Sequence, residues 1–277
     1  MGRNIKFIDI SKCDGCRACS VACKNWNDLP IEIEPYNGTI QSHQNVTANT
    51  WNVVINREVV QPDGSLAWHF RHTACLHCEE PSCALACSEN VITKREDGAV
   101  VIDEEGCVGC GYCVTNCPFD IVQLKKVKIN GKTYEKASKC NLCEGRIAEG
   151  LEPACSRICH TDAIQYGDYD ELMAEAEERL EVVKKRYPDA NIYSPAGVGG
   201  TTTIYLLTEK PSLLGLPENP EVPSSIALWK HVVQPVGKML GVGAAVAVAG
   251  LFVTKKIVQS QTHHTDSEHK EGEDHAG

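Results

Sequence analysis

Short apolar runs recur along the chain and predict β-strands at intervals. Residues 6–10 and 99–103 have similar character, and each run precedes a cysteine-rich loop and a short helical segment. Further apolar runs at 91–93, 121–124 and 163–166 each follow such a loop. This repetition of strand, loop and helix predicts an α+β fold assembled from tandem βαβ-like units.

Residues 26–69 separate the first two cysteine-rich loops and predict a β-hairpin. Its strands are expected at 51–56 and 66–70, on either side of a Pro-Asp-Gly segment at 62–64. Proline presets one backbone dihedral and glycine accepts a positive one, so this segment is typical of a turn. We expect the hairpin to cover part of the core.

Helical spacing of apolar residues predicts one longer helix over residues 168–185. Acidic residues come early in it and basic residues late, as the helix dipole favours, and Pro188 follows its end. The pattern favours packing against the core over ligand binding. The apolar positions are Leu172, Met173, Ala176, Leu180 and Val183.

The apolar stretch at 239–253 predicts a transmembrane helix over residues 232–254. About 22 helical residues span roughly 33 Å, enough for a hydrocarbon core of about 30 Å. Trp229 suits an interfacial anchor, and a buried core helix is the alternative. Basic residues at 255–256 favour a cytoplasmic C-terminus, but lysines on the other side nearly balance them.

Sixteen cysteines fall into four groups of four, and two groups have the spacing C-x2-C-x2-C-x3-C. Two-residue gaps on a tight loop let three thiolates converge on one cubane, and the fourth cysteine ligates a neighbouring cluster. Four 4Fe-4S clusters in swapped pairs are therefore predicted. The groups are Cys13, Cys16, Cys19, Cys23; Cys75, Cys78, Cys83, Cys87; Cys107, Cys110, Cys113, Cys117; and Cys140, Cys143, Cys155, Cys159.

Zinc ribbons and a disulfide framework are the competing interpretations of the cysteines. Tetrahedral zinc needs two facing C-x2-C pairs, so a third cysteine three positions further on would have no role. Disulfides need an oxidising compartment, and no apolar signal segment precedes the first predicted strand. The spacing favours iron-sulfur clusters over both.

Composition and charge narrow the possible partners of this 277-residue chain. Its 37 acidic and 27 basic side chains give a formal net charge of −10, which argues against binding to nucleic acid. Only four phenylalanines and four tryptophans are available for a core. We therefore expect the clusters to organise the fold and the metal-free chain to fold poorly.

The expected domain organisation has four parts. A ferredoxin-like domain with four clusters occupies residues 1–207, followed by a proline-rich linker at 208–231, the membrane helix at 232–254 and a disordered charged tail at 255–277. Histidines in the tail could bind a metal, but a solvated tail is the simpler interpretation. The domain is divided into modules at 1–25 with 126–207 and at 70–125, with a hairpin insertion at 26–69.

Several motifs together resemble the iron-sulfur (beta) subunit of membrane-bound respiratory formate dehydrogenases of the formate dehydrogenase-N type. The cysteine pattern alone is shared by many electron-transfer subunits of molybdopterin oxidoreductases. The Gly-Val-Gly-Gly-Thr and Leu-Trp-Lys segments and the single C-terminal apolar stretch narrow the resemblance. The matching segments are 8–13, 16–19, 26–28, 75–79, 109–113, 152–155, 197–201 and 228–230.

The resemblance implies how the cysteines are shared among four 4Fe-4S clusters. In the related nitrate reductase subunit a tryptophan replaces one ligand, whereas all sixteen cysteines are present here. Ser88 and His160 stand where a proline often follows the last cysteine, and we expect them to add hydrogen bonds near a cluster. The implied ligand sets are Cys13, Cys16, Cys19, Cys159; Cys23, Cys140, Cys143, Cys155; Cys75, Cys78, Cys83, Cys117; and Cys87, Cys107, Cys110, Cys113.

The resemblance also implies a function in electron transfer, because the sequence offers no catalytic nucleophile or acid-base pair. Electrons would pass from a catalytic alpha subunit with a molybdenum or tungsten pterin, through the clusters, to a membrane cytochrome b gamma subunit and quinone. The chain would lie at the bacterial inner membrane with its cluster domain in the periplasm, exported with the alpha subunit, or alternatively in the cytoplasm. The alternatives are another partner, such as a hydrogenase or a polysulfide, nitrite or sulfoxide reductase, and a zinc-stabilised membrane adaptor.

Overall fold

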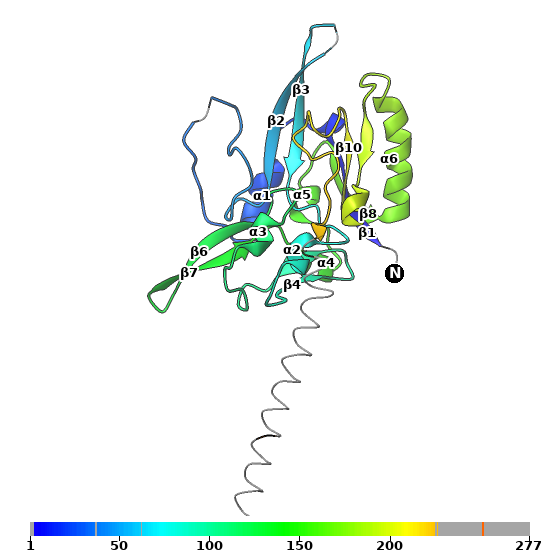
Figure 1. The fold of residues 1–277 in the computed structure, drawn as a ribbon. Coiled ribbons are helices and arrows are strands. Elements are labelled where there is room, and N and C mark those ends of the chain that lie inside the picture. Colours follow the sequence, from blue (N-terminus) through cyan, green and yellow to red (C-terminus); the bar gives the residue numbers. More distant parts are fainter. Residues whose placement is uncertain (1–2, 37, 62, 225, 227–250, 252–277) are drawn as a thin grey trace, which may run out of the picture. The chain divides into compact units, whose positions relative to one another are not determined.

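The computed structural model describes residues 3–36, 38–61, 63–224, 226 and 251 (Figure 1). Contacts divide the chain into two units, Met1–Ile226 and Ala227–Gly277, and all the elements below belong to the first. Apart from residue 251, the expected membrane helix at 232–254 and the tail lie outside the described residues. Among the residues that are described, no helix is both long and apolar enough to cross a bilayer.

A four-stranded sheet with the strand order β8-β1-β10-β9 forms the framework of the first unit. β1 (Asn4–Asp9) and β10 (Thr203–Leu207) pair in parallel at its centre. β8 (Ile164–Asp168) and β9 (Asn191–Tyr193) flank them in antiparallel orientation. The two central strands are almost entirely buried, as is usual for parallel strands covered on both faces.

One face of this sheet is covered by α6 (Tyr169–Val183), which agrees with the helix expected at 168–185 (Figure 1). Asp168 begins the helix, because its side chain accepts hydrogen bonds from the backbone N–H groups of the first turn. Phe7 of β1 and Leu206 of β10 belong to the apolar cluster beneath the helix. This face is thus an ordinary packed core without cysteines.

The opposite face of the sheet looks toward the cysteines. Side chains alternate along a strand, so Ile8 and Tyr205 point away from α6. Both belong to an apolar cluster that also contains Cys19 and Cys155. The central strands therefore separate the helix from the cysteine-rich part of the unit.

The hairpin expected within residues 26–69 is present and extends slightly beyond it. β2 (Val53–Val60) and β3 (Leu66–Thr73) pair in antiparallel fashion from end to end. The half of the hairpin farthest from the turn is buried, with Val53 and Ile55 in the core around Cys75. The hairpin therefore packs against the cysteine region, as its apolar pattern predicts.

Antiparallel hairpins take the place of the βαβ crossovers expected around the middle cysteine groups. β4 (Ile92–Lys94) pairs with β5 (Val100–Ile102), and β6 (Gln123–Ile129) pairs with β7 (Lys132–Ser138). A parallel crossover needs about a dozen connecting residues, more than separate these strands. The apolar pattern does not predict the second hairpin, although the Asn-Gly dipeptide at its tip, residues 130–131, is a strong turn signal.

Four short helices each hold the third cysteine of a group at their second residue. α1 packs against α5, and α2 packs against α3, so the cysteine groups come together in two pairs. The other short elements are α4 (Glu144–Ala148) and the 3-10 turns at Ile10–Lys12 and Ala196–Val198. The four helices are α1 (Ala18–Trp26), α2 (Ser82–Leu85), α3 (Tyr112–Thr115) and α5 (Ala154–Arg157).

Candidate metal centres

The first C-x2-C loop of each cysteine group turns through a residue in the left-handed backbone conformation immediately before its second cysteine. The φ angles are 76° at Gly15, 53° at His77, 71° at Gly109 and 60° at Leu142. Backbone N–H groups around such a residue form a concave nest that binds anionic groups. The cysteine groups that begin at Cys75 and Cys140, which have longer gaps after their second cysteine, therefore offer the same local anion-binding nest as the two groups with regular spacing.

Gly109 and Gly15 allow two of these loops to approach the hairpins closely. A Cβ atom on Gly109 would lie 2.2 Å from the carbonyl oxygen of Glu135 in β7. A Cβ atom on Gly15 would lie 2.7 Å from a ring carbon of Phe70 in β3. Since both glycines also have positive φ, no other residue fits these positions without displacement of the loop.

The fourth cysteine of three groups begins a second recurrent turn. In each case its carbonyl oxygen accepts a hydrogen bond from the N–H group three residues later, where an Asn or Asp adopts positive φ. The turn forms whether the next residue is Pro118, Ser88 or His160. The pairs are Asn90 with Cys87 at 3.4 Å, Asp120 with Cys117 at 3.2 Å, and Asp162 with Cys159 at 3.3 Å.

Three cavities of similar size, with empty volumes of about 310, 340 and 330 Å³, are each lined by four cysteines. Cys13 and Cys19 both interact electrostatically with Cys159, and Cys19 also with Cys16, which defines a fourth assembly. We number these sets along the unit. The first set is Cys13, Cys16, Cys19 and Cys159; the second Cys23, Cys140, Cys143 and Cys155; the third Cys75, Cys78, Cys83 and Cys117; and the fourth Cys87, Cys107, Cys110 and Cys113.

Each set takes three cysteines from one group and its fourth cysteine from the partner group. The packing of α1 against α5 exchanges Cys23 and Cys159 between the first and second sets. The packing of α2 against α3 exchanges Cys87 and Cys117 between the third and fourth sets. Helix pairing therefore brings the fourth cysteine of each group to the first three cysteines of its partner group.

The sulfur spacing does not suit a single zinc ion in any of the sets. Four thiolates around zinc, with Zn–S bonds of about 2.3 Å, lie about 3.8 Å from one another. Among the described residues, which include all sixteen cysteines, no three cysteine sulfurs lie within 4.8 Å of one another. The structure contains no disulfide bond among the sixteen cysteines, all of which are described. The wider spacing of the sulfur atoms in each set fits a larger, polynuclear group such as an iron-sulfur cubane.

Shared apolar clusters connect the four sets in a linear order. One cluster contains cysteines of the first set together with Cys155 of the second. Another joins Cys140 of the second set to Cys75 of the third. The last contains Cys83 of the third set and Cys113 of the fourth. The order through the protein is therefore first, second, third and fourth.

The two ends of this series are the most accessible parts of it. Cys16 in the first set and Cys110 in the fourth are exposed, whereas the other cysteines are buried or half-buried. Because these two thiols lie at the surface, the first and fourth sets are the ones that a partner protein can approach.

Burial keeps the metal-free thiols protonated. It raises the pKa of the Cys19 thiol to about 11, and the pKa values of the Cys83 and Cys155 thiols to about 12. Thiolates are the forms that bind metals, so a bound metal must supply the positive charge that stabilises them here. The donor chemistry of the sets thus fits a group rich in cationic iron.

Two lysines are buried beside the inner sets. Although burial lowers the pKa of an amine, the negative charge that neighbouring cysteines carry as thiolates, Cys155 and Cys140 foremost, holds the pKa of Lys6 above its ordinary value. Likewise, the thiolate charge of Cys75 and Cys83 outweighs the effect of burial on Lys139 and raises its pKa. Neither lysine was predicted from the sequence, although a lysine inside an apolar strand, as Lys6 is, was a usable signal.

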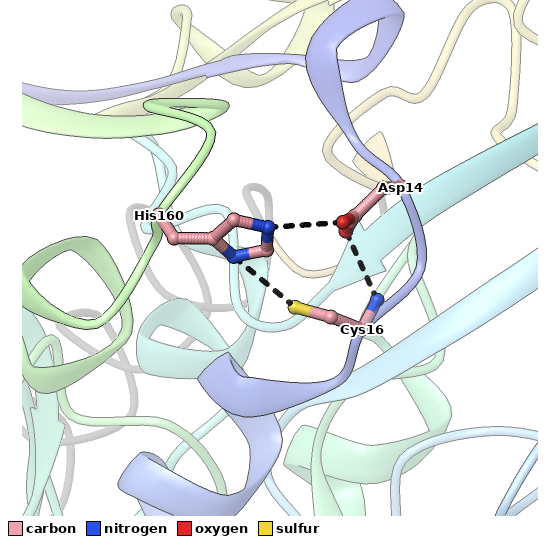
Figure 2. Close-up of side chains that lie close together, drawn as sticks. All are labelled: Asp14, Cys16 and His160. Carbon is pink, nitrogen blue, oxygen red and sulfur yellow. Dashed lines mark hydrogen bonds and ion pairs between the residues drawn. The ribbon is translucent and has the colours of Figure 1, made fainter.

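At the first set, an exposed histidine bridges a cysteine and a carboxylate. Figure 2 shows His160 with its Nδ1 atom 3.8 Å from the sulfur of Cys16 and its Nε2 atom 3.0 Å from an oxygen of Asp14. The backbone N–H of Cys16 donates to the same carboxylate at 3.2 Å. His160 is thus placed to contact a ligand of the first set, as expected. The hydroxyl of Ser88, in contrast, donates a hydrogen bond to the carboxylate of Glu89 and not to a cysteine.

Comparison with known proteins agrees with this geometry. Residues 66–169 match the family described as 4Fe-4S dicluster domain. The iron-sulfur subunits of the nitrate-inducible formate dehydrogenase and of formate dehydrogenase-O, both from Escherichia coli K12, are 39% and 40% identical over 252 residues. These alignments cover 89% of this chain and 82% and 79% of the relatives. A subunit of the anaerobic dimethyl sulfoxide reductase from the same organism is 34% identical over 172 residues, covering 60% of this chain and 74% of the relative.

The fold and the cysteine sets define the chain as an iron-sulfur protein with 4Fe-4S dicluster architecture. Similarity along most of its length then assigns it more narrowly. It belongs to the family of formate dehydrogenase iron-sulfur subunits. The role that follows from this family is electron transfer.

Proposed function

We propose that the chain relays electrons one at a time through four 4Fe-4S clusters, one in each cysteine set. The observation that supports this most directly is the gathering of sixteen cysteines into four sets of four. The residues that hold the clusters are those of the first, second, third and fourth sets as defined above. When bound, the clusters supply the one-electron redox chemistry, and the protein supplies the thiolates and backbone N–H groups that hold them.

The linear order of the sets supports a single path through the protein. Electrons enter at one exposed end and leave at the other, at the sets that contain Cys16 and Cys110. The inner sets are shielded from water by the central sheet and the β2–β3 hairpin. This shielding favours transfer between clusters over loss of electrons to solvent oxidants.

The reaction partners are proposed from the relatives. The catalytic partner is a molybdopterin subunit that contains molybdenum or tungsten and oxidises formate. The accepting partner is a membrane cytochrome b subunit that reduces quinone. The names of the most similar relatives, which are formate dehydrogenase subunits, support the choice of formate.

The proposed location is the bacterial inner membrane, with residues 232–254 as a single membrane-spanning helix. The cluster domain would lie in the periplasm and the C-terminus in the cytoplasm. The length of the apolar stretch and the basic residues after it support this arrangement. Protease digestion of intact spheroplasts tests it: a cluster domain that is degraded from outside agrees with the proposal, and one that is protected requires the cytoplasmic orientation.

Metal analysis and spectroscopy of the anaerobically purified membrane complex test the electron-transfer function. We expect about sixteen iron and sixteen sulfide per chain, because each cubane contains four of each. Reduction by formate should produce EPR signals of reduced cubanes at low temperature. A protein that contains zinc in place of iron, or that has no acid-labile sulfide, would refute the function.

A second candidate function keeps the electron-transfer role but changes the catalytic partner. The similarity to the dimethyl sulfoxide reductase subunit supports a reductase partner as that candidate. Spectroscopy of the same membrane complex distinguishes the formate partner from the reductase partner. Clusters that are reduced by dithionite and not by formate, and are then reoxidised by a sulfoxide, would favour the reductase.

A further inference from the structure

Lys6 is the most deeply buried cation in the described part of the chain that has no hydrogen-bond partner there. Its side chain is fully buried, and its Nζ atom contacts no acceptor among the described residues. A buried ammonium without a partner is costly, so such a group is retained only where something compensates its charge. The groups around Nζ show what compensates this charge.

The strand direction points Lys6 at the second set. Lys6 lies in β1 two residues before Ile8, so both side chains project from the face opposite α6. Lys6 lines the cavity of the second set together with the four cysteines of that set. The amine therefore faces the group that this set binds.

Two further buried side chains present unpartnered nitrogens to the same cavity. The Nδ2 atom of Asn52 and both ring nitrogens of His72 have no hydrogen-bond partner among the described residues. The carbonyl oxygen of Asn52 already accepts from Ser20 at 3.4 Å, which leaves its amide N–H groups for the cavity. The unpartnered polar atoms around this cavity are thus all nitrogens, and most of them are donors.

The third and fourth cavities lack an unpartnered amine among their described surroundings. Lys139 is buried beside the third set, but its Nζ atom donates to the backbone carbonyl oxygens of Val100 and Cys140. Around the third cavity, the hydroxyl of Ser82 is the one unpartnered buried side-chain atom among the described lining residues. The fourth cavity has none among its described lining residues, which include the carboxylate of Glu89. The lysine next to the fourth set, Lys136, donates to the carbonyl oxygen of Cys107 at 2.6 Å, so the second set differs from the fourth in having a buried lysine without a partner.

We propose that Lys6, assisted by Asn52, raises the reduction potential of the second-set cluster. This inference rests on the proposed function, because it takes the cavity to hold a cluster. Reduction adds one negative charge to a cluster, and nearby positive charge and N–H donors stabilise the reduced form. Lys6 is thus a tuning residue, and its charge makes the second cluster easier to reduce.

EPR-monitored potentiometric titration of the full chain in its membrane complex tests the proposal. The Lys6→Met substitution should lower the midpoint of one cluster by at least a tenfold change in its reduction equilibrium, ~59 mV for one electron. Asn52→Leu should lower the same spectral component by a smaller amount, because it removes a neutral donor. Lys126→Met, at an exposed lysine of β6, is the control for net charge and should leave all four midpoints unchanged.

Iron and sulfide content separates failure of the proposal from failure of the proposed function. A wild-type protein without about sixteen iron refutes the function and leaves no cluster to tune. A Lys6→Met variant with full iron and four unchanged midpoints refutes the proposal alone. If Lys6→Met loses iron, two other variants test the proposal: Lys6→Gln, which keeps a hydrogen-bond donor without the charge, and Asn52→Leu. If the variants that keep full iron have unchanged midpoints, the proposal is overturned.

Discussion

Gly109 is the position where a single methyl group should cost the protein one cluster. This glycine lies between Cys107 and Cys110 of the fourth set, with φ of 71°. A Cβ atom there would lie 2.2 Å from the carbonyl oxygen of Glu135, whereas ordinary contact begins at 3.4 Å. In Gly109→Ala the loop must therefore withdraw from β7 by about 1.2 Å.

The size of this displacement determines the expected result. Ligand constellations tolerate errors of about 0.5 Å, so a shift of more than twice that amount should prevent three thiolates from meeting one cubane. The positive φ adds about 1–2 kcal/mol for any residue with a Cβ atom. We expect Gly109→Ala to lose about four of about sixteen iron atoms, those of the fourth set.

Gly131 provides the matched control. It lies at the tip of the β6–β7 hairpin with φ of 77°, and a Cβ atom there would meet nothing within 4 Å. Gly131→Ala therefore carries the same conformational cost of about 1–2 kcal/mol without the collision. Iron analysis and the loss of one EPR component distinguish the variants. Equal iron content and equal thermal transitions in the two variants would refute the reasoning.

Three further predictions concern other parts of the protein. Cys117→Ser should remove the third-set cluster and about four iron atoms; iron content equal to that of the wild type would contradict the assignment of Cys117 to this set. Asp9→Asn should lower the thermal transition, with a loss of about 1–3 kcal/mol, because the buried carboxylate accepts from Arg179 at 3.0 Å. Although burial raises the pKa of Glu32, hydrogen bonds from Thr47 and Thr50 hold it below its ordinary value. The stabilisation is thus present at neutral pH and lost as pH falls through the folded-state pKa; a lower protection factor of the Thr50 amide in acid, relative to its intrinsic exchange rate, should reveal this, and the same pH dependence in Glu32→Gln would exclude it.

Local features of the fold could be predicted from the sequence because neighbouring residues specify them. The helix at α6 follows from its apolar period and its Asp168 cap, and the β2–β3 hairpin follows from two apolar runs around a Pro-Asp-Gly turn. The regular cysteine spacing indicated tight loops that present three thiols each. The Asn-Gly signal of the β6–β7 hairpin was also present, although the apolar pattern alone does not reveal its strands.

Other features depend on contacts between distant residues, and no local pattern specifies them. The sequence does not show that β1 and β10 pair in parallel, because nearly two hundred residues separate Lys6 from its partner Thr203. Leu142 is not a residue type that favours positive φ, so packing of its loop imposes this conformation.

By itself, therefore, the sequence determined the chemistry: sixteen thiols with spacing suited to cubanes, and by resemblance the way they are shared. Only the tertiary structure decided the environment of each set, because burial and charge arise where distant segments meet. Lys6 shows the difference most clearly. In the sequence it is one lysine near the N-terminus, and in the fold it is a buried cation facing the second set, because the pairing of β1 with β10 encloses it.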